Sequence, residues 1–424
     1  MISNKKLVFC IFLSALFVRL LYVLIIPQLS LAGSDAIEYD VAAERLLSGK
    51  GLPLERLADN QVEIVRPPLF PMFLAGIYVT FGHHYTAVRI VHALLSALLV
   101  FFIYYLTLDI FKKEAVALIA CLLCSFYPPL IAYTGLLYSE TVFIFFLMLA
   151  MFFLNSAAAR AKPGFYALTG FSLGIATMVS SRSLYIPVFI LAGLLCAVRA
   201  KKTVVKGFCQ IVIVMMLVFS PWTIRNYFVS GGKFILLENY SSETALWLAT
   251  NPQGEILKWS YDKEPLKSLV GNLPLAQRTP VIRKEAINNL KRYPLAYFRN
   301  SFKRFFVLLI ASHSNCFYGF EKSLQQTISE GQMLKASVKA ALFFLNVVVI
   351  FLGFFGMWLF RKEWRSSIVL LIPIYYTLLL HTFYVAAPRL QIPMMPFLIM
   401  FAAFGMVRIT ESFKKRCAKL RSLR

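Results

Sequence analysis

Long apolar runs alternate with short basic connections along most of this chain. A membrane-spanning helix requires about 20 mainly apolar residues, and the sequence supplies runs of that kind repeatedly. We predict full spans at residues 7–27, 86–111, 114–131, 137–157, 164–180, 183–199, 206–227, 337–360, 366–386 and 390–410. The pattern therefore predicts an all-α membrane protein that crosses the bilayer many times.

Two further apolar stretches, at 67–82 and 302–313, are too brief to cross a bilayer unaided. We interpret both as interfacial or re-entrant helices at the outer face, with a tilted span as the alternative. Larger outer regions remain at 28–85 and 228–336, and neither holds a Gly-rich nucleotide-binding loop or a separate soluble domain. We therefore expect a single membrane-embedded domain over residues 1–424.

The charge pattern predicts how the chain is oriented. The net charge is +24, although only 15% of residues are charged and 59% are hydrophobic. The basic residues gather at alternate ends of the predicted spans rather than on one soluble face. That pattern follows the positive-inside rule and argues against a nucleic-acid partner. We expect a multi-pass protein of a bacterial inner membrane, with a cytoplasmic N-terminus and a basic cytoplasmic tail at 411–424.

An acidic segment, GSDAIEYDVAAERLLSGKG, directly follows the first predicted span. Asp35 comes so soon after the span that the membrane should hold it near the headgroups, and Glu38 shares its face of a helix. One hypothesis makes Asp35 a general base that takes a proton from an acceptor hydroxyl. The structural alternative is a helix start capped by Ser34. Asp40 and Glu44 are weaker candidates for a role in chemistry.

Several arginines lie where the positive-inside rule disfavours them, at predicted outer positions: Arg66, Arg89, Arg182, Arg225 and Arg389. Each requires either a carboxylate partner, such as Asp35 or Glu140, or a lipid phosphate. Glu140 opens the fourth span, as a helix-start acid or as a second active-site carboxylate. Arg19 lies near the middle of the first span, so we expect it to pair with a carboxylate or to face a polar cavity.

Five strings of the sequence, taken in order, resemble one known family. They are SDAIEYDVAAERLLSGKGL, RPPLFPMFLAGIYVTFG, YPPLIAYTGLLYSETVF, PWTIRNYFVSGGKF and APRLQIPMMPFLIMFAAFG. Together they resemble the family 39 glycosyltransferases, the superfamily of the protein O-mannosyltransferases and of the aminoarabinose transferase of lipid A. The resemblance implies a GT-C-type bundle of about 10–12 transmembrane helices with outer-face loop helices. It also implies a polyprenyl-phosphate-sugar donor and an active site at the outer face.

The resemblance implies roles for three residues: Asp35 as catalytic base, with Arg66 and Arg389 near the donor phosphate. Together with the other acidic residues and arginines of the outer face, they make up the candidate site. The expected catalytic residues are Asp35, Glu38 and Glu140. The expected donor-phosphate-binding residues are Arg66, Arg389, Arg182 and Arg225. The protein mannosyltransferases have an Asp-Glu pair where this chain has Asp35-Ala36, and they carry a soluble insert absent here. The chain also lacks the C-terminal outer domain of the lipid A enzyme, so the acceptor stays open.

The function we expect is an inverting, single-displacement hexosyl- or pentosyltransferase. It would move sugar from a polyprenyl-phosphate donor to a hydroxyl or phosphate of a lipid, lipopolysaccharide or other cell-envelope glycan. The rivals are a transporter or flippase of a lipid-linked sugar, and an O-antigen polymerase or ligase. Paired halves and broken helices would indicate a transporter, and the sequence shows neither. The histidines lack a ligand spacing, so we expect no metal, and no cofactor is expected.

Overall fold

The computed structural model describes most of the chain. The described residues are 2–27, 34–52, 55–56, 62–63, 66–238, 241–253, 266–271, 273, 275–310 and 312–421. Parts of both predicted outer regions, including 28–33 and 254–265, therefore lie outside the described residues.

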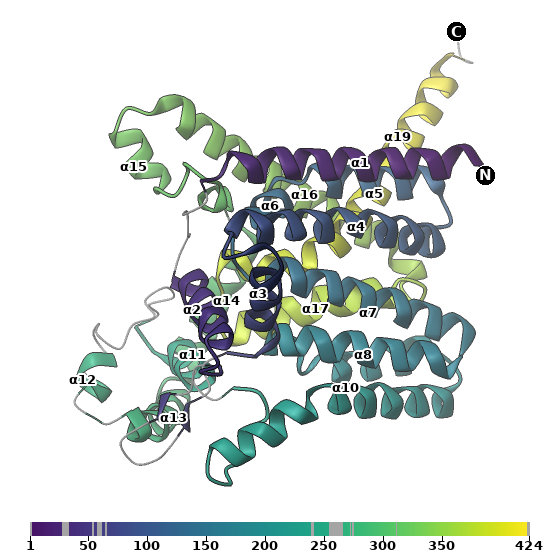
Figure 1. The fold of residues 1–424 in the computed structure, drawn as a ribbon. Coiled ribbons are helices and arrows are strands. Elements are labelled where there is room, and N and C mark those ends of the chain that lie inside the picture. The colour runs from purple at the N-terminus through teal and green to yellow at the C-terminus, as the bar shows by residue number, and fades with distance from the viewer. Residues whose placement is uncertain are drawn as a thin grey trace.

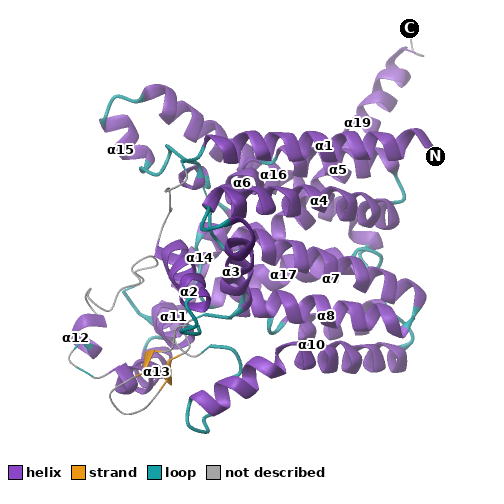
Figure 2. Cartoon of the chain, viewed as in Figure 1, coloured by secondary structure: helices purple, strands orange, loops and turns teal. Residues whose placement is uncertain are grey.

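Parallel and antiparallel helices form a bundle, and they account for nearly all the ordered structure in Figures 1 and 2. Within the described part of the chain, six helices are long and apolar enough to cross a membrane. They are α1 (Ile2–Ile25), α4 (Tyr85–Phe111), α7 (Glu140–Arg160), α10 (Lys201–Val229), α16 (Met333–Phe360) and α19 (Met395–Arg421). The prediction of an all-helical membrane bundle is confirmed.

One predicted span is a broken helix. The segment predicted as 114–131 forms α5 (Glu114–Phe126), α6 (Pro128–Ala132) and the 3-10 turn η1 (Tyr133–Gly135), with a bend of 52°. The break falls at Tyr127, whose backbone is extended and which precedes two prolines. A residue before proline is pushed out of the helical region, which explains the break. The sequence analysis did not predict it.

Three other predicted spans are helices of 12 to 17 residues, shorter than the length criterion. They are α8 (Pro163–Val179), α9 (Ile186–Ala197, preceded by η2, Ser181–Ser183) and α17 (Ile368–Phe383). In Figure 1, α8 and α17 run alongside the long helices. By length and composition alone, six helices qualify as spans, or seven if the broken pair is counted as one. Of the other three predicted spans, α8 has the predicted length, whereas α9 and α17 are shorter than predicted.

Small residues bring some helices into close contact. A Cβ atom added to Gly356 of α16 would lie 1.9 Å from the backbone oxygen of Phe401 in α19. A Cβ on Gly170 of α8 would lie 2.5 Å from the backbone oxygen of Ile211 in α10. Glycine at these two contacts allows backbones to approach closely, as is common between membrane helices.

Helix α19 is the most enclosed of the six long helices. In its most apolar window of 18 residues, 89% of the residues are buried, against 28% for α1. The run from Met395 to Ala403 is buried throughout. A short lead-in, α18 (Pro388–Gln391) and η5 (Ile392–Met394), connects α17 to this central helix.

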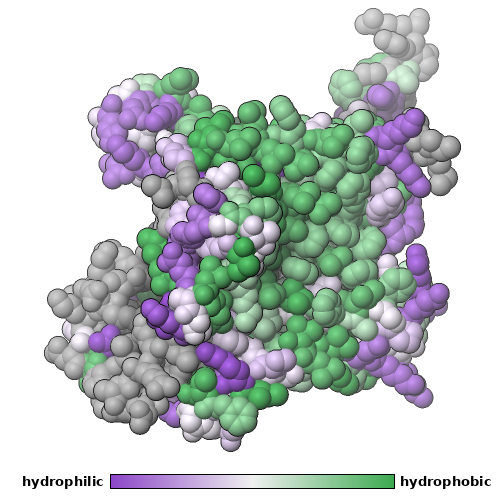
Figure 3. Space-filling model, viewed as in Figure 1, coloured by the Kyte–Doolittle hydropathy of each residue, from purple (hydrophilic) through white to green (hydrophobic). Residues whose placement is uncertain are grey.

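The remaining elements gather at one end of the bundle, opposite the N-terminus and the C-terminal end of α19 (Figure 1). They are α2 (Ser34–Leu47), α3 (Leu69–Phe81), α11 (Ser241–Thr250), α12 (Leu266–Val270), α13 (Leu275–Arg292), α14 (Pro294–Leu309), η3 (Ser314–Cys316), α15 (Leu324–Ser329) and a two-stranded pair, β1 (Glu55–Arg56) and β2 (Val62–Glu63). The turn η4 (Arg361–Glu363) follows α16. Figure 3 shows a largely hydrophobic surface over the bundle, with hydrophilic residues toward both ends.

The two short apolar stretches are both helical. The stretch at 67–82 forms α3, which has 13 residues. The stretch at 302–313 belongs to α14, which begins earlier than predicted, at Pro294, and ends at Leu309. Whether either helix re-enters or spans the membrane stays a prediction.

Candidate active site

Helix α2 carries Asp35, Glu38, Asp40 and Glu44, and its apolar positions form a buried face. Ala36, Tyr39 and Ala43 are buried, while Ile37 and Glu38 between them are exposed. The ring of Tyr39 meets the ring of Phe70 in α3 edge-on, with centroids 4.7 Å apart. The helix is therefore fixed against α3 by its apolar positions, and Asp35 lies in its first turn. The side chain of Ser34 lies outside the described structure, so the capping interpretation stays a prediction.

Asp35 lies between two arginines that are remote in sequence. One carboxylate oxygen accepts a hydrogen bond from Arg66 Nη2 at 2.9 Å, and the other accepts from Arg389 Nη1. The Asp35 side chain is 15% exposed, against 27% for Arg66 and 38% for Arg389. The three residues come from α2, from the Pro67-Pro68 turn before α3, and from the first turn of α18. The fold thus brings together the three residues that the family resemblance singled out.

The arginines control the ionisation of Asp35. Burial alone would raise its pKa, but the charges and hydrogen bonds of Arg389 and Arg66 outweigh burial, so the pKa of Asp35 lies below the ordinary value of 3.8. The carboxylate is therefore charged at neutral pH. With a guanidinium on each oxygen, it is also a weak base.

Glu38 belongs to the same cluster through Arg66. Its carboxylate accepts from Arg66 Nε at 3.0 Å and from Arg66 Nη2 at 2.8 Å. The Arg66 guanidinium also lies 5.5 Å from the centroid of the Tyr39 ring. Arg389 likewise lies 5.8 Å from the ring of Tyr138, a residue that the sequence analysis missed. The one sequence signal for Tyr138 is that it lies two residues before Glu140.

Glu140 and Arg182 form a second ion pair. Arg182 Nη2 lies 3.3 Å from a Glu140 oxygen, and the Glu140 side chain is only 5% exposed. The guanidinium packs 5.0 Å from the ring of Phe143. Burial is the main cause that raises the pKa of the Tyr39 hydroxyl, and the carboxylates of Glu140 and Asp35 act in the same direction. Both carboxylates therefore lie near Tyr39, and the second pair borders the first cluster.

Arg225 has different surroundings from the other predicted phosphate-binding arginines. Its guanidinium lies 4.5 Å from the ring of Trp222, and Nη1 donates to Asn226 Oδ1 at 3.3 Å. Both partners belong to its own helix, α10. Among the described residues, no ion pair connects Arg225 to Asp35.

The segment that presents Arg389 is held by buried polar side chains. Gln391 donates to the backbone oxygens of Leu308 and Leu309 in α14, at 2.7 and 3.2 Å. Arg304 of α14 donates to the backbone oxygen of Thr382 at 2.9 Å, just before the same segment. These bonds fix the connection between α17 and α18, and the sequence analysis missed both donors.

Arg19 and Arg89 both donate hydrogen bonds to backbone oxygens near the broken helix. Arg19 donates to Ser96 Oγ at 2.9 Å and to the backbone oxygen of Ser125 at 2.8 Å. Arg89 donates to the backbone oxygens of Gly135 and Pro27, at 3.0 and 2.9 Å. Of the two expectations for Arg19, polar surroundings are therefore found, whereas the described residues show no carboxylate partner. Because α5 ends at the break, backbone oxygens of its last turn have no partner within the helix, and Arg19 donates to them.

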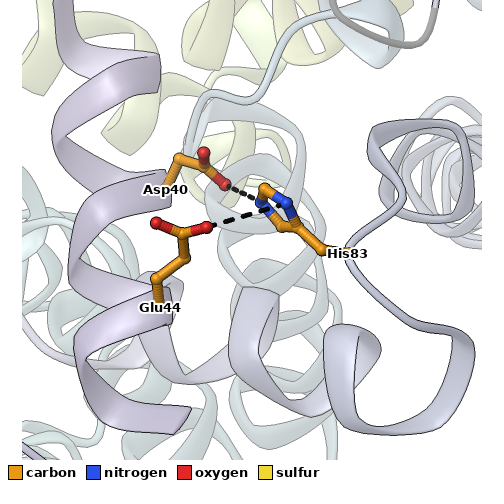
Figure 4. Close-up of side chains that lie close together, drawn as sticks. All are labelled: Asp40, Glu44 and His83. Atoms are coloured by element: carbon orange, nitrogen blue, oxygen red, sulfur yellow. Dashed lines mark hydrogen bonds and ion pairs between the residues drawn. The ribbon is translucent and has the colours of Figure 1, made fainter. Parts of the chain in front are cut away.

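A second polar cluster connects α2 to the turn between α3 and α4 (Figure 4). His83 Nε2 lies 2.9 Å from Asp40 Oδ1, and His83 Nδ1 lies 3.7 Å from Glu44 Oε1. Hydroxyls of Tyr78 and Tyr85 also donate to the two oxygens of Asp40, at 2.6 and 2.7 Å. One ligand atom from each of Asp40, Glu44 and His83 lies within 4.8 Å of the others, a spacing that fits a metal ion. Because Asp40 already has three partners, we interpret the cluster as a structural connection between the helices.

The helical bundle with a polar layer at one end is the fold of the GT-C membrane glycosyltransferases. Over 99% of its length, the chain matches the archaeal oligosaccharyltransferase AglB from Archaeoglobus fulgidus in complex with an inhibitory peptide and a dolichol-phosphate. The TM-score is 0.56 at 13% identity, and 52% of that chain is covered. A second structure of the Archaeoglobus fulgidus oligosaccharyltransferase, tethered with an acceptor peptide, gives a TM-score of 0.56 at 13% identity, covering 97% of this chain and 50% of that one. The chain therefore spans about half the length of these proteins.

A family model agrees with the fold. Residues 65–224 match the model described as dolichyl-phosphate-mannose-protein mannosyltransferase. ArnT from Cupriavidus metallidurans in the apo state is also similar, with a TM-score of 0.44 at 14% identity, covering 95% of this chain and 78% of that one. No curated protein sequence matches significantly. The resemblance to membrane glycosyltransferases that use polyprenyl-phosphate-linked donors is confirmed, while the roles of single residues stay predictions.

Proposed function

We propose that this protein transfers a sugar from a polyprenyl-phosphate-sugar donor to an acceptor at the outer face of a membrane. The observation that carries the proposal is Asp35 held between Arg66 and Arg389 at one end of a GT-C bundle. A carboxylate and two guanidinium groups are the parts such a reaction requires: a base for the acceptor and cations for the leaving phosphate.

The reaction is a single displacement. The acceptor oxygen attacks the anomeric carbon, and its proton passes to the Asp35 carboxylate. The bond between the anomeric carbon and the phosphate oxygen breaks, and its electron pair leaves with the lipid phosphate, which becomes a monoester. Arg66 and Arg389 stabilise the charge that develops on that phosphate. Attack from the face opposite the leaving group inverts the anomeric centre, and no covalent enzyme intermediate or cofactor is needed.

Arg182 and Glu140 extend the site in this proposal. Their pair borders the Asp35 cluster and is mostly buried, so Arg182 places a further guanidinium group beside that cluster. Arg225 stays a weaker candidate for donor binding, since the partners described for it, Trp222 and Asn226, lie in its own helix. The acceptor is a hydroxyl or phosphate of a lipid, lipopolysaccharide or other cell-envelope glycan.

Charge supports an outer-face site. Basic residues follow α4 and close α7, at Lys112, Lys113 and Arg160. Both helices begin near the candidate site, at Tyr85 and Glu140, and therefore run from that end of the bundle to the end where the N-terminus lies (Figure 1). By the positive-inside rule, the basic end is cytoplasmic and the candidate site is periplasmic or extracellular.

The test is sugar transfer by the purified protein in nanodiscs. A panel of radiolabelled polyprenyl-phosphate sugars is offered with candidate acceptors, and Asp35→Asn is run beside wild type. Transfer by wild type that falls at least about a hundredfold in the variant supports the proposal. Equal transfer by both proteins contradicts Asp35 as base. The broken helix α5–α6 favours a transporter of lipid-linked sugar as the second candidate, and donor translocation that survives Asp35→Asn, without transfer, would support it.

A further inference from the structure

The cations of the candidate site already have anionic partners in the ligand-free protein. Both oxygens of Asp35 accept hydrogen bonds from guanidinium groups, one from Arg66 and one from Arg389. Arg66 is bound more fully, because Nε and Nη2 both donate to Glu38, at 3.0 and 2.8 Å. The carboxylates therefore occupy N–H groups that a lipid phosphate would need.

Phosphates and carboxylates bind guanidinium in the same way. Each anion presents oxygens that accept two parallel N–H···O hydrogen bonds from one guanidinium group. A phosphate and a carboxylate therefore compete for the same N–H donors. When a phosphate accepts hydrogen bonds from Arg66 and Arg389, Asp35 receives fewer hydrogen bonds from these two arginines. Asp35 then loses the charges that hold its pKa below 3.8 and becomes a stronger base.

We propose that Asp35 occupies the anion subsite of the resting protein, and that the phosphate of a polyprenyl-phosphate donor displaces it from Arg66 and Arg389. This inference rests on the proposed function and adds regulation to it: the base is released only when the donor is bound. The carboxylate is thus both the competitor of the substrate and the base of the reaction.

The exchange also resets the site after turnover. The proton taken from the acceptor resides on Asp35 while the arginines hold the product phosphate. When that phosphate leaves, the arginines return to Asp35, and the carboxyl group gives its proton to water. Acid–base chemistry is coupled in this way to donor binding and product release, which keeps an unoccupied site from acting as a base.

The binding test measures affinity for undecaprenyl phosphate in nanodiscs. Asp35→Asn removes the competing charge, so we expect it to bind about three- to tenfold more tightly than wild type. Asp109→Asn is the matched control, because Asp109 pairs with Lys112 at the other end of α4 and should leave affinity unchanged. Undecaprenol, which lacks the phosphate, should bind all three proteins alike.

Unchanged or weaker binding by Asp35→Asn overturns the exchange, as does equal tightening by Asp109→Asn. Glu38→Gln is a second variant, for the case in which Asp35→Asn does not fold. It frees Arg66 from its other carboxylate and should also tighten binding, by less, because Glu38 is 45% exposed. Undecaprenyl phosphate is not turned over, so the binding result is independent of sugar transfer. Loss of transfer in Asp35→Asn without tighter binding would support the proposed function and reject the exchange.

Discussion

Replacing Arg389 by glutamine tests the chemistry of the candidate site most directly. The change removes one of the two cations beside Asp35 and keeps an amide that still donates a hydrogen bond. Removing one donor aimed at developing charge typically costs about 10²- to 10³-fold in kcat. Arg389 is 38% exposed, so solvent screens part of its effect, and we expect the lower end of that range, about 10²-fold.

The pH dependence supplies a second signature. The reaction needs Asp35 ionised, so activity is present above its pKa and is lost as the pH falls through it. Arg389 is the largest of the charges that hold the pKa of Asp35 below 3.8. In Arg389→Gln that pKa rises, and the acidic limb of the kcat/KM profile must move to higher pH.

Arg225→Gln is the matched control for this measurement. It removes the same charge from an arginine that contacts Trp222 and Asn226 of its own helix. The acidic limb should keep its wild-type position in Arg225→Gln, whatever happens to donor affinity. An acidic limb that does not move in Arg389→Gln, or that moves equally in both variants, refutes the assignment of Asp35 as the base.

Three further variants test the support of the site and the packing of the bundle. Arg304→Met removes the arginine donor from the backbone oxygen of Thr382, beside the Arg389 segment, and from that of Ala249 in α11, at about 1–3 kcal/mol each. Loss of the Thr382 bond also misplaces Arg389, so both the melting temperature and kcat should fall; a fall in melting temperature alone would reject the positioning role. Gly356→Ala places a Cβ against the backbone of α19 and should destabilise the protein by about 1–3 kcal/mol, whereas Gly164→Ala, with open space around its Cβ, should not. Asp40→Asn weakens the charge-assisted hydrogen bonds from the hydroxyls of Tyr78 and Tyr85, so it should lower the melting temperature in detergent. Glu44→Gln should have a small effect, because Glu44 is 56% exposed. Equal shifts of the melting temperature in the two variants would contradict the structural role of the cluster.

Much of the bundle could be predicted from the sequence, because apolar length is a direct consequence of the hydrocarbon thickness. Apolar length alone does not show where a helix is interrupted, so the break at Tyr127 was missed, although the two prolines that follow this residue are a sequence signal for it. The same break explains the surroundings of Arg19. A carboxylate partner or a polar cavity was expected there, and backbone carbonyls at the end of the broken helix accept its hydrogen bonds without a counter-charge.

The candidate site was partly within reach of the sequence. Asp35 and Arg389 are 354 positions apart in the sequence. The predicted spans placed both residues at the outer face of the membrane, but they did not predict that the two side chains are in contact. Only the fold shows that they bind each other. Gln391 and Arg304 could not be found in this way, since their function depends on which backbone groups the connection between α17 and α18 leaves without partners.

The enclosure of α19 has a consequence for how proteins of this fold are detected. A helix that faces lipid must present apolar side chains to it, whereas a helix surrounded by protein has no such requirement. Among the six long helices of the described chain, α19 is the least apolar and the most buried, and α1 is the most apolar. A stricter hydropathy threshold would therefore discard the central helix first and keep the peripheral ones. In a distant relative, the segment that carries the arginine opposite Asp35 is the one a genome-wide search for spans is most prone to lose.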